Sequence, residues 1–140
     1  MDVRASGRDT SCYDLLEKKM KWGVYVDSSG CTPCKMNLYQ WKQVMSEYKN
    51  YFDSLAFVFI IHSENPKKID IICEQNQFDY PVFYDRFGKM GKLNDLPHDV
   101  ALQTFLLDEE NKIKLIGNPL LYPKLMDLYT DVICENCKAK

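Results

Sequence analysis

The sequence Gly30-Cys-Thr-Pro-Cys-Lys35 places two cysteines two residues apart, between a β-type run and a stretch with helical periodicity. The run before it, Trp22-Gly-Val-Tyr-Val-Asp27, is rich in β-branched and aromatic residues, and apolar residues recur at spacings of three and four after Lys35. A helix N-terminus favours a thiolate, and Pro33 has no N–H to leave unpaired in a first helical turn. Two cysteines at such a junction predict reversible disulfide chemistry.

The two thiols are expected to have different roles. Cys31 lies at the expected helix start beside Gly30, so it should be the more exposed thiol and the nucleophile. Cys34 lies one turn into the expected helix and should be the buried resolving thiol. Each exchange would pass through a mixed disulfide between Cys31 and a partner, which is released when Cys34 attacks. A static disulfide and two ligands of a zinc site are the alternatives.

The composition is typical of a single globular domain. The chain has 140 residues, of which 46% are hydrophobic and 27% charged, and its formal net charge of −2 argues against nucleic-acid binding. We expect one domain over 1–140, with about 1–12 and 134–140 loosely ordered. No apolar run is long enough to span a membrane. Residues 1–7 lack the apolar region of a signal peptide, which is compatible with a leader removed before this point.

Hydrophobic periodicity predicts the order of the secondary-structure elements. We expect a short helix at 13–21, a strand at 22–26, a helix at 35–52, a strand at 56–61, a helix from 65 to about 78, a strand at 81–84, a hairpin of 101–107 and 112–116, and a helix from 123 to about 133. This order predicts an α/β fold with a mixed central sheet flanked by helices.

Several stretches, in this order, resemble the thioredoxin superfamily, and within it TlpA/ResA-like thiol–disulfide oxidoreductases of the Bacteroidota type. They lie between about Trp22 and about Ile133, at Val24–Asp27, Cys31–Lys35, Tyr80–Asp85, Thr104–Asp108 and Asn111–Gly117. The resemblance implies a thioredoxin-like fold and disulfide exchange through Cys31 and Cys34. It implies no cofactor and no metal, and as partners protein thiols or disulfides and an unidentified redox protein. It also implies a periplasmic or otherwise extracytoplasmic location, while a cytoplasmic one stays open.

The chain departs from this family around the cysteines. Gly30 stands where most relatives have an aromatic residue, and Tyr25 where thioredoxins keep a buried acid. Asn37 stands where TlpA/ResA-like proteins often keep a glutamate. Asp27 could partly substitute for these acids, but its position favours a role as a turn residue.

A further departure lies at Gln103-Thr104, where the family has a cis-proline followed by threonine. A cis bond before a residue other than proline costs about 3 kcal/mol, so we expect a trans bond at Gln103. Its side chain should face the Cys31–Cys34 disulfide. Gln103 and Thr104 should line the substrate groove together with Gly30, Thr32 and Pro33. In the family the proline also keeps metals away from the thiols, so its replacement makes metal binding more credible.

A second CxxC pair, Cys134 and Cys137, follows the last expected helix. The negative end of the helix dipole and Glu135 should raise the pKa of these thiols, which makes them poor nucleophiles. We expect a tail disulfide between them or with Cys12; a relay to the first pair and a zinc site are the alternatives. Cys73, on the apolar face of an expected helix, should be a core residue.

The resemblance and the thiols together favour a reductant or isomerase over a strong oxidant. Thr32-Pro33 lacks the histidine that stabilises a thiolate in oxidising relatives, and a less stabilised thiolate makes a more reducing couple. His62 and His98 could lie near the thiols, but a lone loop histidine is more often a surface residue. A non-enzymatic binding or metal-handling module is the alternative function, and a thiol peroxidase would need a lone reactive cysteine.

Overall fold

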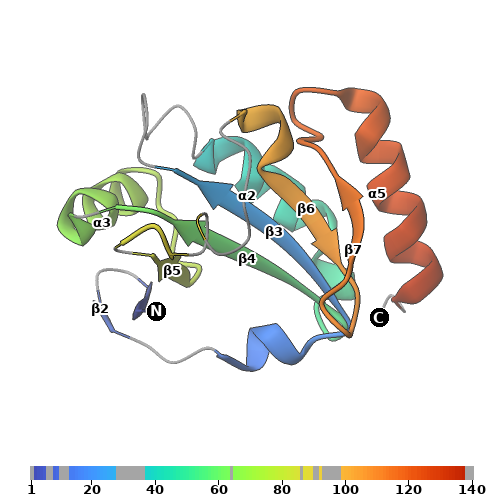
Figure 1. Ribbon diagram of the computed structural model, residues 1–140, viewed down its shortest axis with the longest axis horizontal. Helices are drawn as coiled ribbons and strands as arrows, with labels where there is room; N and C mark the ends of the chain where they lie inside the picture. The colour runs from blue at the N-terminus through green and yellow to red at the C-terminus, as the bar shows by residue number, and fades with distance from the viewer. Residues whose placement is uncertain are drawn as a thin grey trace.

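The computed structural model describes residues 2–5, 8–9, 13–27, 37–63, 65–85, 87–89, 92 and 99–137 (Figure 1). Outside these ranges lie the following residues discussed above: Cys12, Gly30, Cys31, Thr32, Pro33, Cys34 and His98.

The strands form one mixed sheet in the order β2-β1-β5-β4-β3-β6-β7. Their bounds are Asp2–Ala5 (β1), Arg8–Asp9 (β2), Met20–Val26 (β3), Leu55–Ile61 (β4), Val82–Tyr84 (β5), Thr104–Leu107 (β6) and Ile113–Ile116 (β7). The central strands β3, β4 and β5 run parallel, and β6 runs antiparallel to β3. The mixed α/β architecture expected from the sequence is therefore confirmed.

The N-terminal segment, which was expected to be loosely ordered over about 1–12, contains two short strands in its described part, and the expectation stays a prediction. Strand β1 pairs antiparallel with β5, and β2 pairs with β1, so the two strands extend the sheet at one edge. Strand β2 is the edge strand, since among the described strands only β1 pairs with it.

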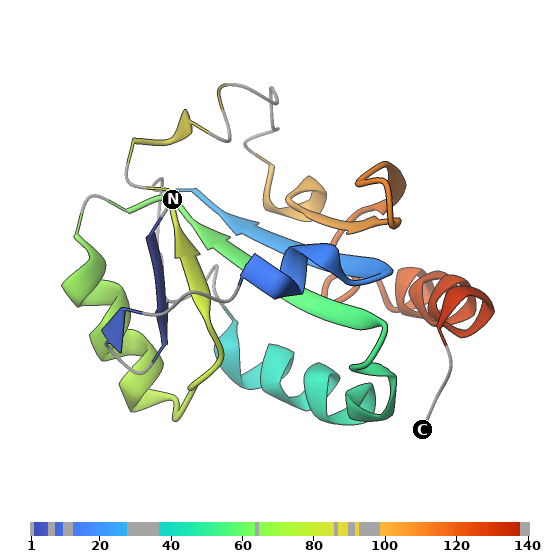
Figure 2. The ribbon, with the colours of Figure 1, turned by 90° about the horizontal axis from the view of Figure 1, so that it is seen from below.

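The helices α2 (Leu38–Glu47), α3 (Pro66–Gln75) and α5 (Pro123–Asn136) pack on one face of the sheet (Figure 2). Trp22 of β3 lies at the centre of this core and is fully buried. Its ring stacks on Phe57 and on Tyr129, with ring centroids 4.9 and 4.7 Å apart. The hydroxyl of Tyr129 donates to the carbonyl oxygen of Gly117 at 2.8 Å, which fastens α5 to the end of β7.

The other face of the sheet carries a smaller apolar cluster of Tyr25, Val58, Ile60, Phe83 and Phe105. Leu15, from the 3₁₀ turn η1 (Tyr13–Glu17), packs against it. Two further 3₁₀ turns, η2 (Lys49–Tyr51) and η3 (Val100–Leu102), follow α2 and precede β6.

Three element boundaries differ from the sequence expectations. The helix expected at 13–21 is only the turn η1, in which Leu16 is 40% exposed, and Met20 already belongs to β3. Helix α2 begins at Leu38, directly after Asn37, which adopts a left-handed conformation with φ of 45°, whereas the expected helix start at Lys35 lies outside the described residues. Asparagine tolerates this conformation better than most residues, and an α-helix cannot continue through it. The last helix extends to Asn136, three residues beyond the expected end.

Candidate functional site

The carboxyl ends of the parallel strands meet at one edge of the sheet. Val26 pairs with Ile61 and Ile61 with Tyr84. The residues that follow these strand ends, Asp27, His62 and Asp85, are therefore neighbours across the sheet. The backbone N–H of His62 donates to Val26 at 2.8 Å and that of Asp85 to Ile61 at 2.9 Å, which continues the ladder beyond the strands. The chain passes from this edge towards the first CxxC sequence.

Asp27 and Gln103 form the central contact of this edge. Nε2 of Gln103 donates to Oδ2 of Asp27 at 2.8 Å, and the two residues are 2% and 7% exposed, respectively. The carbonyl oxygen of Gln103 also accepts from the N–H of Tyr25 at 2.9 Å. Asp27, which the sequence favoured as a turn residue, is thus a buried hydrogen-bond acceptor. This expectation is corrected, because its partner lies 76 residues away along the chain.

The peptide bond before Gln103 is trans, as expected, but the side chain of Gln103 contacts a residue that was not expected. None of the peptide bonds between described residues is cis, so the bond from Leu102 to Gln103 is trans. Its side chain reaches Asp27, whereas its expected position against the Cys31–Cys34 disulfide concerns thiols outside the described residues. Thr104 is buried at the start of β6, where its carbonyl oxygen accepts from Gly117 at 2.8 Å.

A second carboxylate, Asp85, lies buried at the same edge. Its Oδ1 accepts from the N–H of Lys89 at 3.0 Å. Burial raises the pKa of Tyr25, and the charges of Asp85 and Asp27 raise it further, so this phenol stays protonated at neutral pH. The sequence analysis missed Asp85 as part of this edge. Its position directly after a strand, like that of Asp27, was the available signal.

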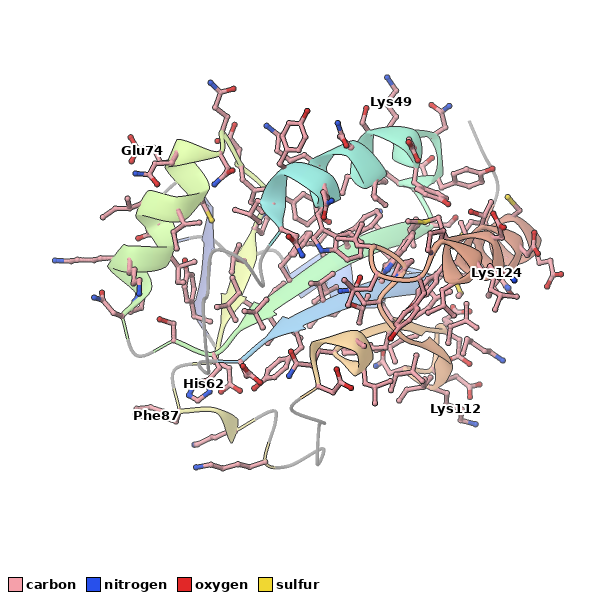
Figure 3. The ribbon with its side chains drawn as sticks, turned by 90° about the horizontal axis from the view of Figure 1, so that it is seen from above. Lys49, His62, Glu74, Phe87, Lys112 and Lys124 are labelled. Atoms are coloured by element: carbon pink, nitrogen blue, oxygen red, sulfur yellow. The ribbon has the colours of Figure 1, made fainter. Side chains whose placement is uncertain are left out.

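His62 lies half-buried beside this edge and packs against the loop that carries Phe87 (Figure 3). Gly88, with φ of 67°, allows this packing, because a Cβ there would lie 2.7 Å from Cε1 of His62. His62 is therefore close to the end of β3, whereas its expected position near the thiols concerns residues outside the described ranges. In the described part of the chain, no three histidine, cysteine or acidic side chains are grouped as a metal site.

The cysteines within the described ranges, Cys73, Cys134 and Cys137, are free thiols. Cys73 is buried in the core on α3, as expected, and burial raises its pKa to about 11. Cys134 is exposed and Cys137 is buried. The expectation of a tail disulfide at Cys134 and Cys137 is wrong for this structure, since both sulfurs are unbonded.

Comparison with known proteins identifies the fold. Neither a protein-family model nor a curated protein matches the sequence. Among solved structures, a protein described as the thiol:disulfide interchange protein DsbE of Chlorobium tepidum matches with a TM-score of 0.69 and 16% identity, covering 95% of this chain and 92% of the other. A thioredoxin-like protein in its oxidised form matches with a TM-score of 0.67 and 17% identity, covering 96% and 90%.

A thiol–disulfide oxidoreductase from Bacteroides fragilis matches with a TM-score of 0.66 and 16% identity, and the match covers 91% of this chain and 96% of the other. At these identities the likeness establishes the fold, and the activities belong to the matched proteins. No helix in the described ranges is both long and apolar enough to cross a membrane.

Proposed function

We propose that this chain, which has the thioredoxin-like fold, is a thiol–disulfide oxidoreductase that reduces or exchanges disulfides in other proteins through Cys31 and Cys34. The observation that carries the proposal is the position of the CxxC sequence in that fold. It follows β3, the strand whose end bears the buried Asp27–Gln103 contact. The matched structures described as thiol–disulfide proteins support the same chemistry.

The proposed mechanism uses the thiols in sequence. The thiolate of Cys31 attacks a disulfide of the partner, forms a mixed disulfide and releases one partner thiolate. Cys34 then loses its proton and attacks the sulfur of Cys31, which releases the second partner thiol. Two electrons pass to the partner, and Cys31 and Cys34 end as a disulfide.

Asp27 is the proposed proton acceptor for Cys34 in the second step. It supplies a buried carboxylate that this chain lacks at Tyr25 and Asn37, where relatives carry their acids. The hydrogen bond from Gln103 holds the Asp27 carboxylate in one orientation. A positioned base within reach of a thiol typically contributes about 100-fold or more to the rate of proton transfer.

The partner groove is proposed to comprise Gly30, Thr32, Pro33, Gln103 and Thr104. We propose that Gln103 restricts partners, because it offers a polar amide where relatives present the apolar ring of a cis-proline. The absence of a histidine between the cysteines favours a reducing or isomerising role. An extracytoplasmic location is proposed from the family resemblance, and a cytoplasmic one remains the alternative.

Trapping of mixed disulfides tests this proposal. Cys34→Ser should accumulate a mixed disulfide between Cys31 and a disulfide-containing protein, whereas Cys31→Ser should accumulate none. Wild-type protein should reduce the same substrate when supplied with dithiothreitol. Equal alkylation rates for both thiols of the reduced protein would contradict the assigned roles.

A binding or metal-handling module is the second candidate, and the polar residue at Gln103 favours it over a general reductase. It predicts a stoichiometric metal in freshly purified protein and no disulfide turnover. The metal content and the reduction potential of Cys31–Cys34, measured on one preparation, separate the two candidates.

A further inference from the structure

Cys134 and Cys137 lie in the last turn of α5 with different environments. Cys134 is a helical residue and is exposed, whereas Cys137 caps the helix with an extended backbone and is 5% exposed. The N–H of Cys137 donates to the carbonyl oxygen of Ile133 at 2.8 Å, so Cys137 directly follows the last turn, and Cys134 is close enough to add to the rise that burial causes in the pKa of the Cys137 thiol. A disulfide needs about 3.5–4.5 Å between Cβ atoms, so closure requires a movement of Cys137, whose backbone is extended and not helical.

The surroundings of the two sulfurs favour a reaction in which Cys134 attacks first and Cys137 attacks second. The hydroxyl of Tyr51, from η2, lies 3.4 Å from Sγ of Cys134 and is within hydrogen-bonding distance of it. Cys137 packs in the apolar core beside Ile133, and burial raises the pKa of its thiol. Cys134 is therefore accessible to an external reagent, while Cys137 is reached only from within the protein.

This pair lies at the end of β3 opposite Asp27, the last described residue before the first CxxC sequence. Figure 1 shows the end of α5 beside the start of β3. Lys19, which precedes β3, lies close enough to Cys137 for its positive charge to offset part of the rise in pKa that burial causes. The seven residues of β3 separate this end from Asp27. At about 3.3 Å per residue the two ends are about 20 Å apart. We therefore expect this pair to react on its own rather than by transfer to Cys31 and Cys34.

We propose that Cys134 and Cys137 form a second thiol–disulfide couple, which reacts with external disulfides independently of Cys31 and Cys34. Cys134 loses its proton to water, attacks the external disulfide and releases one thiolate. Cys137 then loses its proton, attacks the sulfur of Cys134 and releases the second thiolate. The couple loses two electrons and becomes a disulfide, and the external disulfide becomes two thiols. The neighbouring hydroxyl of Tyr51 donates a hydrogen bond to the Cys134 thiolate.

The test uses the full chain with Cys12, Cys31 and Cys34 replaced by serine, so its outcome does not depend on the proposed function. The reduced protein is treated with oxidised glutathione, alkylated at intervals and mapped by mass spectrometry. We expect Cys134 and Cys137 to end as an internal disulfide that carries no glutathione. Cys73, which is buried, is the internal control and should react at least about tenfold more slowly.

Two variants in this background assign the roles. Cys137→Ala keeps an apolar side chain in the core and should retain one glutathione on Cys134. Cys134→Ser should leave Cys137 reduced. The proposal is overturned if Cys134 stays unmodified, or if it keeps glutathione while the Cys137 thiol remains open to alkylation. If Cys137→Ala exposes Cys73 and so reports unfolding, the unsubstituted background and Cys134→Ser decide the result.

Discussion

At the scale of single residues, the contact between Gln103 and Asp27 joins the two segments that flank the proposed site. The amide of Gln103 donates to a buried carboxylate, and its carbonyl oxygen accepts from Tyr25. Removing the donor to a buried acceptor lowers the free energy of unfolding by about 1–3 kcal/mol. Substitutions at this contact therefore affect stability as well as chemistry. Substitutions that keep the hydrogen bond are needed to separate these effects.

Asp27→Asn is such a substitution, because the asparagine oxygen can still accept from Gln103. We expect it to keep the fold and to slow the attack of Cys34 by about 100-fold, since the proton acceptor is lost. Rapid mixing with a model disulfide, followed by an acid quench, would show the mixed disulfide on Cys31 accumulating. Asp127→Asn, at an exposed acid on α5, is the matched control and should leave the rate unchanged. An unchanged rate in Asp27→Asn would remove Asp27 from the mechanism.

Gln103→Pro tests whether this position restricts partners. We expect the proline ring to raise general disulfide-reductase activity several-fold against a broad substrate such as insulin. Gln103→Ala is the control, because it also removes the hydrogen bond to Asp27 but adds no ring. Equal activities in the wild type and in Gln103→Pro, with the wild type already reducing insulin well, would show that Gln103 does not limit recognition.

At the scale of elements, the apolar runs were sufficient to place the central strands β3, β4 and β5 and the helices α3 and α5, but they did not predict β1, β2 or the turn η1. The continuous run of β4, buried along its whole length, predicted a central strand. The start of α2 was not predictable, because the apolar periodicity continues through Asn37 while its backbone adopts a left-handed conformation. The burial of Asp27 was not predictable either, because it depends on Gln103, whose position is set only when β6 pairs with β3.

The pairing of β6 with β3 depends on a glycine. Gly23 faces Phe105 across the ladder, and a Cβ on Gly23 would lie 2.2 Å from the phenyl ring. Gly23→Ala should therefore lower the free energy of unfolding by about 1–3 kcal/mol through overpacking. Phe105→Leu opens space at this position, so the double variant should lose less than the sum of the single losses. Urea unfolding of the four proteins measures the coupling, and strict additivity would contradict the proposed clash.

At the scale of the whole molecule, β3 lies between the Cys134–Cys137 pair and the buried Asp27. The three described helices on one face form the larger core, which includes both Trp22 and Cys137. This arrangement places α5's last turn beside the start of β3, whereas Asp27 follows the other end of the strand. The seven residues of β3 span about 20 Å between α5's last turn and Asp27.

We therefore expect the two pairs to act independently in the monomer. Cys134→Ser combined with Cys137→Ser should leave the reduction potential of Cys31–Cys34, and disulfide-reductase activity with dithiothreitol as donor, unchanged. Cys137 is buried, so the unfolding midpoint must be measured alongside the activity. The combination of Cys134→Ser with Cys137→Ala is the control for a destabilised core.

Loss of activity in both folded variants would mean that electrons do pass between the pairs. If such transfer occurs between molecules, the rate per molecule in wild-type protein rises with protein concentration. A rate that is lost in both variants yet independent of concentration would show that the two pairs approach each other within one chain, and the separation of the two ends by β3 would be wrong.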